Sequence, residues 1–222
     1  EINFNKNIYS NNFGYGNFNS NIKISNYDTN KFEKFFINDF DWTYDKIFGN
    51  LPYDGKFLTS LKNVNYEVKN VSNLKQELTH EFFGAIGYLA SLDLKKENTE
   101  NSSHLLTPKI LFKYAPNYMK KVTGDHNLHN KNIFSLDRIN SSTSLEGGAS
   151  ITYGFDYIKS FKNDNKFNFS IGQIINEKKT DKNKPDTSSL DKRFSDIIGD
   201  LNFKKNNFQV NYKYSLDQNF KE

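Results

Sequence analysis

Hydrophobic and polar residues alternate along most of this 222-residue chain. The stretch "ASITYGFDY", residues 149–157, is typical: one side of an extended strand would carry Ile151, Tyr153, Phe155 and Tyr157, and the other Thr152, Gly154 and Asp156. Successive side chains of a strand point to opposite faces, so the pattern predicts one apolar and one polar environment. A soluble sheet packed on a core and a membrane-spanning sheet packed on lipid would both produce it.

The same alternation, read against turn-forming residues, predicts about ten antiparallel strands and hence an all-β fold. The strands are expected near residues 1–9, 15–27, 35–46, 57–69, 79–94, 105–117, 145–161, 166–176, 194–204 and 207–217. Most are about 10 residues long or slightly longer, which is the length of a tilted strand that crosses a bilayer.

The clearest alternation is "FQVNYKYSLD", residues 208–217. Its apolar set is Phe208, Val210, Tyr212, Tyr214 and Leu216, and its polar set includes Gln209, Asn211, Lys213 and Ser215. In a membrane barrel these four polar residues, together with Thr152 and Asp156, would face a wet lumen while the apolar set faces lipid; in a soluble sheet the same polar residues would face solvent.

The connections between the expected strands differ in length. Segments 118–144 and 177–193 are long, whereas 162–166 and 204–207 are short and polar, in the order long, short, long, short. An up-and-down membrane barrel has short turns on one side and long loops on the other, which requires this order. The segment 177–193 is charged and has no apolar period, so we expect an exposed, mobile loop there. We predict that residues 71–80 form a loop that leads into a strand.

The amino-acid composition and the charge exclude some classes of function for this chain. The chain combines 16% aromatic residues with a mean hydropathy of −0.78, as expected where every second strand residue is wet. The net charge of +4 comes from Lys residues spread along the chain, which predicts no nucleic-acid partner. No run approaches the roughly 18 apolar residues of a membrane-spanning helix. The start, "EINFNKNIYS", carries no leader, so a signal peptide is expected to be removed or to lie outside this segment.

Candidate catalytic and metal-binding residues are few. The chain has no Cys, which excludes disulfides and thiolate zinc sites within it. His126 and His129 lie near Asp125 in a loop without further ligands, and neither Ser135 nor Ser150 has a nucleophile-elbow context. We therefore expect no catalytic residue, no metal and no cofactor, and we read the glycines on or near strands as sites of bends or close packing.

Several motifs occur together in the second half of the chain: "HLLTPKILFKYAPNYMKK", "NIFSLDRI", "LEGGASITYGFDY" and "FSDIIGDLNF". Their order and spacing over about residues 105–217 resemble the C-terminal barrel of the LptD (OstA/Imp) family of lipopolysaccharide-assembly proteins. The residues that carry the resemblance are Pro108, Pro116, Phe134, Asp137, Arg138, Gly148, Gly154, Asp196 and Gly199. The "FSLDR" segment is shorter than the family commonly has, which leaves the local loop geometry open.

The resemblance implies a role in the outer-membrane translocon that inserts lipopolysaccharide into the outer leaflet of a Gram-negative bacterium, without enzymatic activity. Residues 1–222 would form part of a larger transmembrane β-barrel, with the N-terminal periplasmic domain and the barrel ends outside this segment. The implied partners are an LptE-like lipoprotein plug, lipopolysaccharide, outer-membrane lipid and, through the N-terminal domain, the periplasmic Lpt bridge.

The Asp137–Arg138 pair has two readings. As part of the resemblance, its loop folds toward the lumen and Arg138 bonds to backbone carbonyls or to an acidic wall residue. Alternatively it is a solvent-exposed pair worth less than ~1 kcal/mol. For the whole chain, the alternatives are a complete ten-stranded outer-membrane barrel, porin-like or hydrolytic, and a soluble β-sandwich binding module.

Overall fold

A computed structural model of the chain describes residues 1–27, 30–45, 52–72, 74–98, 102–116, 118–122, 124–161 and 165–217. Twelve strands and one short 3-10 turn occur in this part: β1 (Ile2–Ser10), β2 (Gly14–Tyr27), β3 (Lys31–Tyr44), β4 (Asp54–Lys69), β5 (Thr79–Ser91), β6 (Leu94–Asn98), β7 (Ser102–Tyr114), β8 (Ser150–Phe161), β9 (Lys166–Thr180), η1 (Asp186–Ser188), β10 (Lys192–Phe194), β11 (Ile197–Lys205) and β12 (Phe208–Leu216). None of the helices described is long and apolar enough to cross a membrane.

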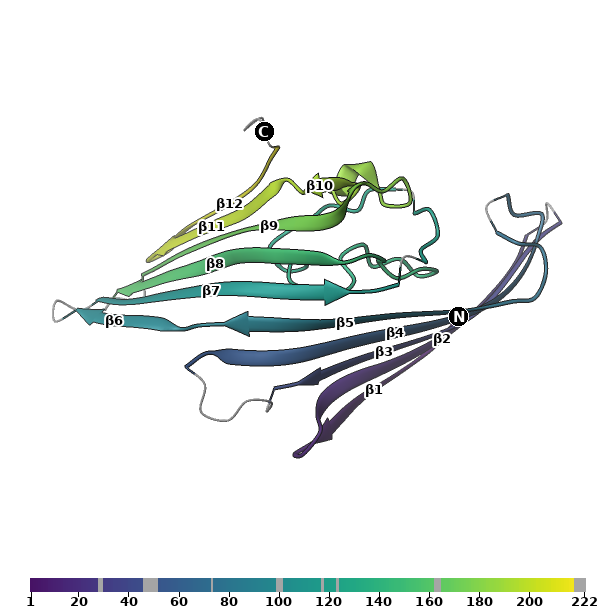
Figure 1. Cartoon of the computed structure of the whole chain (residues 1–222), viewed down its shortest axis with the longest axis horizontal. Coiled ribbons are helices and arrows are strands. Elements are labelled where there is room, and N and C mark those ends of the chain that lie inside the picture. Colours follow the sequence, from purple (N-terminus) through teal and green to yellow (C-terminus); the bar gives the residue numbers. More distant parts are fainter. Residues whose placement is uncertain are drawn as a thin grey trace.

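All the strands belong to one antiparallel sheet, which confirms the predicted fold class (Figure 1). Its order is β1-β2-β3-β4-β5-β7-β8-β9-β11-β12, so each main strand pairs with its neighbour in the sequence. The two short strands are side branches: β6 pairs with β7 and β10 pairs with β9. A β-sandwich would place two sheets face to face, whereas the described residues form a single sheet.

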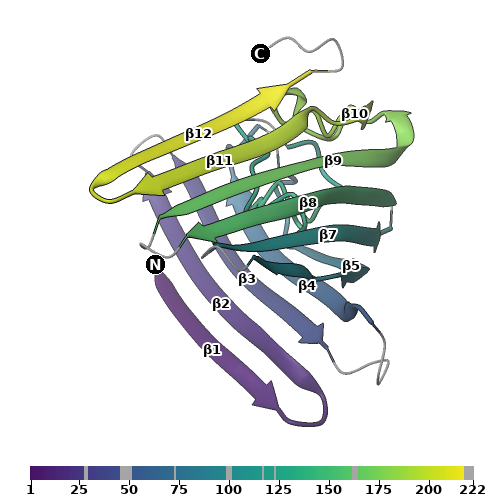
Figure 2. The same cartoon turned by 90° about the vertical axis from the view of Figure 1, so that its left-hand side faces the viewer.

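The sheet is strongly curved and encloses a concave face, with β1 and β12 at its two ends (Figure 2). Within the described residues, β1 is hydrogen-bonded to β2 and β12 to β11, and the two end strands are not paired with each other. The sheet is therefore an open segment of a curved wall with two free edges.

The connections follow the predicted order of lengths. Residues 115–149 link β7 to β8 and residues 181–196 link β9 to β11, whereas 162–165 and 206–207 are short. Both long connections lie at the same end of the strands, the right-hand end in Figure 1. The described part of segment 71–80 contains no helix and leads into β5, as predicted.

Pro108 explains the break between β5, which ends at Ser91, and β6, which occupies residues 94–98, where mostly a connection was expected. The register is constant across the break, with Ser91 opposite Lys109 and Leu94 opposite Leu106. The Leu92 N–H donates to the Pro108 carbonyl at 3.1 Å, but proline has no N–H to complete the antiparallel pair. The ladder loses one hydrogen bond there, and the regular pairing is interrupted.

Several predicted boundaries are wrong. β3 begins at Lys31 rather than near 35, and β9 continues to Thr180 rather than ending near 176. Residues 145–149, which were expected to open a strand, belong to a buried connection. The segment 177–193 is not an exposed loop throughout, since Lys184, Ser188, Ser189 and Leu190 are buried.

The register assigns each side chain of the wall to one face. Thr152 lies opposite Leu111 and Ile174, and all three are fully buried on the concave face. Ile151 lies opposite Phe112, and both point to the convex face, where they are 38% and 47% exposed. The convex face is therefore the more apolar surface that the structure leaves uncovered.

Candidate functional site

The concave face holds a long segment of the chain that folds back against it. This segment, residues 115–149, is called the inward loop below. Its base is closed by two backbone hydrogen bonds of 3.2 Å, from the Ala115 N–H to the Gly148 carbonyl and from the Gly148 N–H to the Ala115 carbonyl. Gly148 has a φ of +95°, a conformation that favours glycine. Pro116, directly after Ala115, begins the departure from the sheet.

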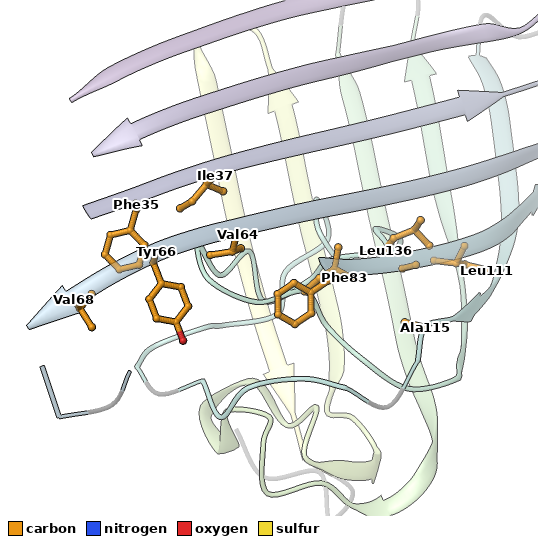
Figure 3. Packing of buried hydrophobic residues seen from close by; sticks show 11 residues of the cluster. Phe35, Ile37, Val64, Tyr66, Val68, Phe83, Leu111, Ala115 and Leu136 are labelled. Atoms are coloured by element: carbon orange, nitrogen blue, oxygen red, sulfur yellow. The ribbon is translucent and has the colours of Figure 1, made fainter. Parts of the chain in front are cut away.

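Apolar contacts fix the inward loop to the wall. Leu136 and Leu145 of the loop join a buried cluster with residues of β3, β4, β5 and β7, namely Phe35, Ile37, Val64, Tyr66, Val68, Phe83, Ala85 and Leu111 (Figure 3). A second cluster joins Ile133 and Ile139 of the loop to Ile174 of β9 and Ile198 of β11. Loop residue Phe134 packs against both clusters. The loop therefore covers the concave surface from β3 to β11.

A buried charge cluster forms the centre of the site. The Arg138 guanidinium donates from Nε to Glu146 Oε2 at 2.8 Å, and its Nη2 also pairs with Glu146 Oε1. The same guanidinium reaches the wall, donating to Ser150 Oγ at 3.0 Å and to Thr152 Oγ1 at 3.2 Å on β8. Arg138 therefore ties the loop both to itself and to β8.

Two lysines complete the cluster. Lys113 Nζ of β7 lies 3.1 Å from Glu146 Oε1, and Lys184 Nζ of the second long connection lies 3.5 Å from the same oxygen. The Arg138 and Glu146 side chains have no exposed surface, and the two lysine side chains are almost fully buried. One carboxylate thus meets three cations contributed by a strand and two separate connections.

The electrostatics of the cluster favour the ionised carboxylate. Burial would raise the pKa of the Glu146 carboxyl, but the charges of Arg138 and Lys113 outweigh burial and hold this pKa well below its ordinary value. Burial lowers the pKa of the Lys184 ammonium, and the nearby Glu146 opposes that shift only in part. Glu146 is therefore a carboxylate at neutral pH, and its removal would leave the cations without their common partner.

A second polar contact joins the loop to β4. Lys62 Nζ donates to the Ser141 carbonyl and lies 3.4 Å from Asp39 Oδ1 and 3.9 Å from Asp137 Oδ2. Burial raises the pKa of the Asp137 carboxyl, and the Lys62 charge opposes that shift. Lys62 thus fixes the position of the loop relative to the wall strands β3 and β4.

Beside this contact lie two adjoining polar cavities of about 410 and 420 Å³, between the loop and strands β1 to β4. They share Asn19, Asp39, Lys62 and Asn140, and we refer to them together as the polar trough. Its walls carry amide, hydroxyl and carboxylate groups, and across β1 and β2 the Asn17 amide donates to Asn5 Oδ1 at 3.0 Å and to Asn7 Oδ1 at 2.8 Å. Such a surface suits water or hydroxyl-rich ligands, because it offers both donors and acceptors.

The structure brings some of the predicted site residues together and separates others. Phe134, Asp137, Arg138 and Gly148 all lie in the inward loop, with Pro116 at its start. Gly154 lies on β8 directly opposite Gly172, and Gly199 lies on β11 under the Tyr214 ring. Pro108 lies within β7, away from the charge cluster. Asp196 precedes β11, and its N–H donates to Ser189 Oγ at 2.8 Å.

The residues predicted to face a lumen lie on the concave face. Thr152 contacts Arg138, and Asp156 pairs with Lys109, whose ammonium lies over the ring of loop residue Phe134. On β12, Ser215 lies opposite Ile198, which is buried against the loop, so Gln209, Asn211, Lys213 and Ser215 share the concave side. That this side lines a lumen stays a prediction.

The residues considered for chemistry have structural partners. His126 Nδ1 lies 2.7 Å from the Ile139 carbonyl, and the Ser135 hydroxyl donates to the Asn132 carbonyl at 2.7 Å. No group of three or more potential metal ligands occurs among the described residues. The reasoning from sequence missed Glu146, Lys113, Lys184 and Lys62; the available signal was that Lys113 and Lys62 occupy concave-face positions of otherwise regular strands.

A family model described as "LptD: LPS transport system D" matches residues 2–222, which is almost the whole chain. The chain belongs to the LptD family. This confirms the resemblance and extends it over the first hundred residues, for which the motifs gave no support. The family acts in lipopolysaccharide transport and assembly, is not an enzyme family, and forms outer-membrane β-barrels, which agrees with the all-β antiparallel sheet. No curated protein matches the chain.

Proposed function

We propose that this chain forms part of the wall of the translocon that inserts lipopolysaccharide into the outer leaflet of the Gram-negative outer membrane. The observation that supports this most directly is the difference between the two faces of the sheet. The convex face is lined by exposed apolar residues, whereas the concave face carries the polar trough and the buried inward loop.

In the proposed arrangement the convex face contacts lipid. Ile151, Tyr153, Phe155 and Tyr157 of β8 share that face, as do Phe208, Val210, Tyr212, Tyr214 and Leu216 of β12. The polar trough and the concave side of β12 line a hydrated lumen that can accommodate the sugar portion of lipopolysaccharide. The long connections mark the extracellular end of the strands, because outer-membrane barrels carry their long loops there.

We also propose that the wall is incomplete without further strands. Among the described strands, none pairs with the outer edge of β1 or of β12, and an open sheet edge within hydrocarbon is strongly disfavoured. Additional strands of a larger barrel, on both sides of this segment, would pair with these edges. In the proposed arrangement, an N-terminal periplasmic domain receives lipopolysaccharide from the Lpt bridge.

A lipoprotein plug of the LptE kind is the proposed partner of the remaining concave surface. The inward loop covers the wall from β3 to β11. The polar trough, in contrast, is lined on its β1 and β2 side by concave side chains that include Asn5, Asn17 and Asn19. This exposed polar surface supports a contact with a hydrophilic protein face.

Depletion of the protein from its native host tests the transport role. We expect newly made lipopolysaccharide to accumulate inside the outer membrane, with surface lipopolysaccharide falling at least fivefold while other outer-membrane barrels remain folded. The measurement is pulse-labelling of lipopolysaccharide followed by a surface-accessibility assay. Unchanged arrival of labelled lipopolysaccharide at the cell surface would overturn the proposal.

A further inference from the structure

A groove crosses the convex face of the wall from β4 to β10, with a volume of about 530 Å³. Its apolar lining comes from Ile86, Tyr88, Phe112, Tyr114, Ile151 and Ile175. The groove lies where β7 ends at Tyr114 and β8 begins at Ser150, next to the base of the inward loop. Lys113 and Ser150 also line the groove, although their side chains contact Glu146 and Arg138 on the concave side.

The groove follows one row of the sheet. Tyr88 lies opposite Phe112, Phe112 opposite Ile151, and Ile151 opposite Ile175. At β4 the row begins at Phe57, after which the convex residues are Thr59, Leu61 and then the polar Asn63. At β9 the row ends at Ile175, directly before Glu177; the convex residues from Phe167 to Ile175 are apolar except Gln173.

The row therefore crosses the apolar band of the wall obliquely, from its periplasmic part at β4 to its extracellular limit at β9. Such an oblique path is expected because barrel strands tilt by about 35–45° relative to the membrane normal. Four interstrand steps of ~4.8 Å give a length of about 19 Å. This is comparable with the ~15 Å depth of the hydrocarbon in one leaflet of a bilayer.

Charged residues mark the extracellular end of the groove. Arg193 of β10 and Glu177 of β9 both line it. Within the described parts of the chain, no carboxylate lies within ion-pair distance of the Arg193 guanidinium, although the neighbouring Lys192 lies 3.9 Å from Asp196. An exposed guanidinium provides a bidentate site for phosphate, and a carboxylate accepts hydrogen bonds from hydroxyl groups.

We propose that this groove is a binding site on the outer wall for an acylated sugar phosphate, the lipid portion of a lipopolysaccharide molecule already in the outer leaflet. One acyl chain lies along the apolar row, the phosphate pairs with Arg193, and a sugar hydroxyl donates to Glu177. This site rests on the proposed orientation of the wall in the outer membrane. It would hold the delivered lipid next to the barrel on the side opposite the lumen.

The test uses the protein as expressed from its native gene, purified in detergent, with Ile151 replaced by the photo-crosslinking residue p-benzoylphenylalanine. Purified lipopolysaccharide is the probe. We expect saturable crosslinking that falls at least fivefold when Arg193→Glu is added. Leu201, which faces the convex side on β11 and does not line the groove, carries the crosslinker in the matched control and should give weak crosslinking that Arg193→Glu does not change.

Equal crosslinking at positions 151 and 201, or no effect of Arg193→Glu, would overturn the site. Competition by phosphatidylglycerol as effective as that by lipopolysaccharide would also overturn it, because the sugar would then contribute nothing. These outcomes are distinct from failure of the transport role, which is read from surface lipopolysaccharide after depletion and does not depend on the groove.

Discussion

Replacement of Glu146 by Gln is expected to destabilise the folded barrel by about 4 kcal/mol or more, since breaking a buried ion pair leaves an uncompensated charge. The substitution keeps the size of the side chain but removes the carboxylate that pairs with Arg138, Lys113 and Lys184. The buried Arg138 guanidinium and the two buried lysine side chains would then lose their common partner. The measurement uses the protein expressed from its native gene. It determines the temperature at which the folded form, which migrates faster on SDS gels, disappears.

Glu33→Gln is the matched control for this experiment. Glu33 pairs with Lys31 at 2.8 Å, but the Lys31 side chain is 39% exposed, so the same chemical change should leave the transition temperature almost unaltered. A double variant, Arg138→Gln with Glu146→Gln, removes one surplus cation and should be more stable than the sum of the single effects predicts. If Glu146→Gln unfolds at the wild-type temperature, the buried cluster does not hold the inward loop.

Gly154→Ala is expected to cost about 3 kcal/mol, near the upper end of typical overpacking penalties. A Cβ at this position would lie 2.2 Å from the Ile171 carbonyl oxygen and 2.8 Å from the Gly172 Cα, which are backbone atoms of the paired strand β9. Backbone cannot move aside without breaking the β8–β9 ladder. Loss of hydrogen-exchange protection in both strands, together with a lower unfolding temperature, would report the effect.

The control for this substitution is Gly84→Ala on β5. A Cβ there meets only Leu61 Cδ2, at 3.2 Å, which is the end of a flexible side chain on the convex face. We expect a change of less than about 1 kcal/mol, because the leucine can shift. If the two alanine variants are equally stable, close approach of β8 and β9 is not the reason for the glycine at position 154.

Local patterns predicted the wall well. Alternation with a period of two depends only on neighbouring residues, so it located the main strands and correctly separated Ile151 from Thr152. Strand β6 was not predicted, because its pairing with β7 beyond Pro108 is a contact between two segments.

The interior of the site depends on contacts between distant segments, which a single sequence does not reveal. The resemblance singled out Arg138 as the residue to fix an inward loop, but its partner Glu146 was not identified, since that pairing depends on the path of the loop. Segment 177–193 was predicted to be exposed because of its charge. Instead, Lys184 is drawn to the Glu146 carboxylate and Leu190 packs against the cluster that contains Ile174 and Ile198.

In the proposed arrangement the convex face contacts lipid and the concave face contacts water. Spin labels on single cysteines test it directly in the membrane-reconstituted protein, with Phe18 and Leu61 as convex positions and Asn19 and Ser60 as concave positions that line the polar trough. We predict that oxygen dissolved in lipid accelerates the relaxation of the convex labels. A water-soluble nickel complex should accelerate the relaxation of the concave labels. Equal access of the nickel complex to both faces would contradict the account.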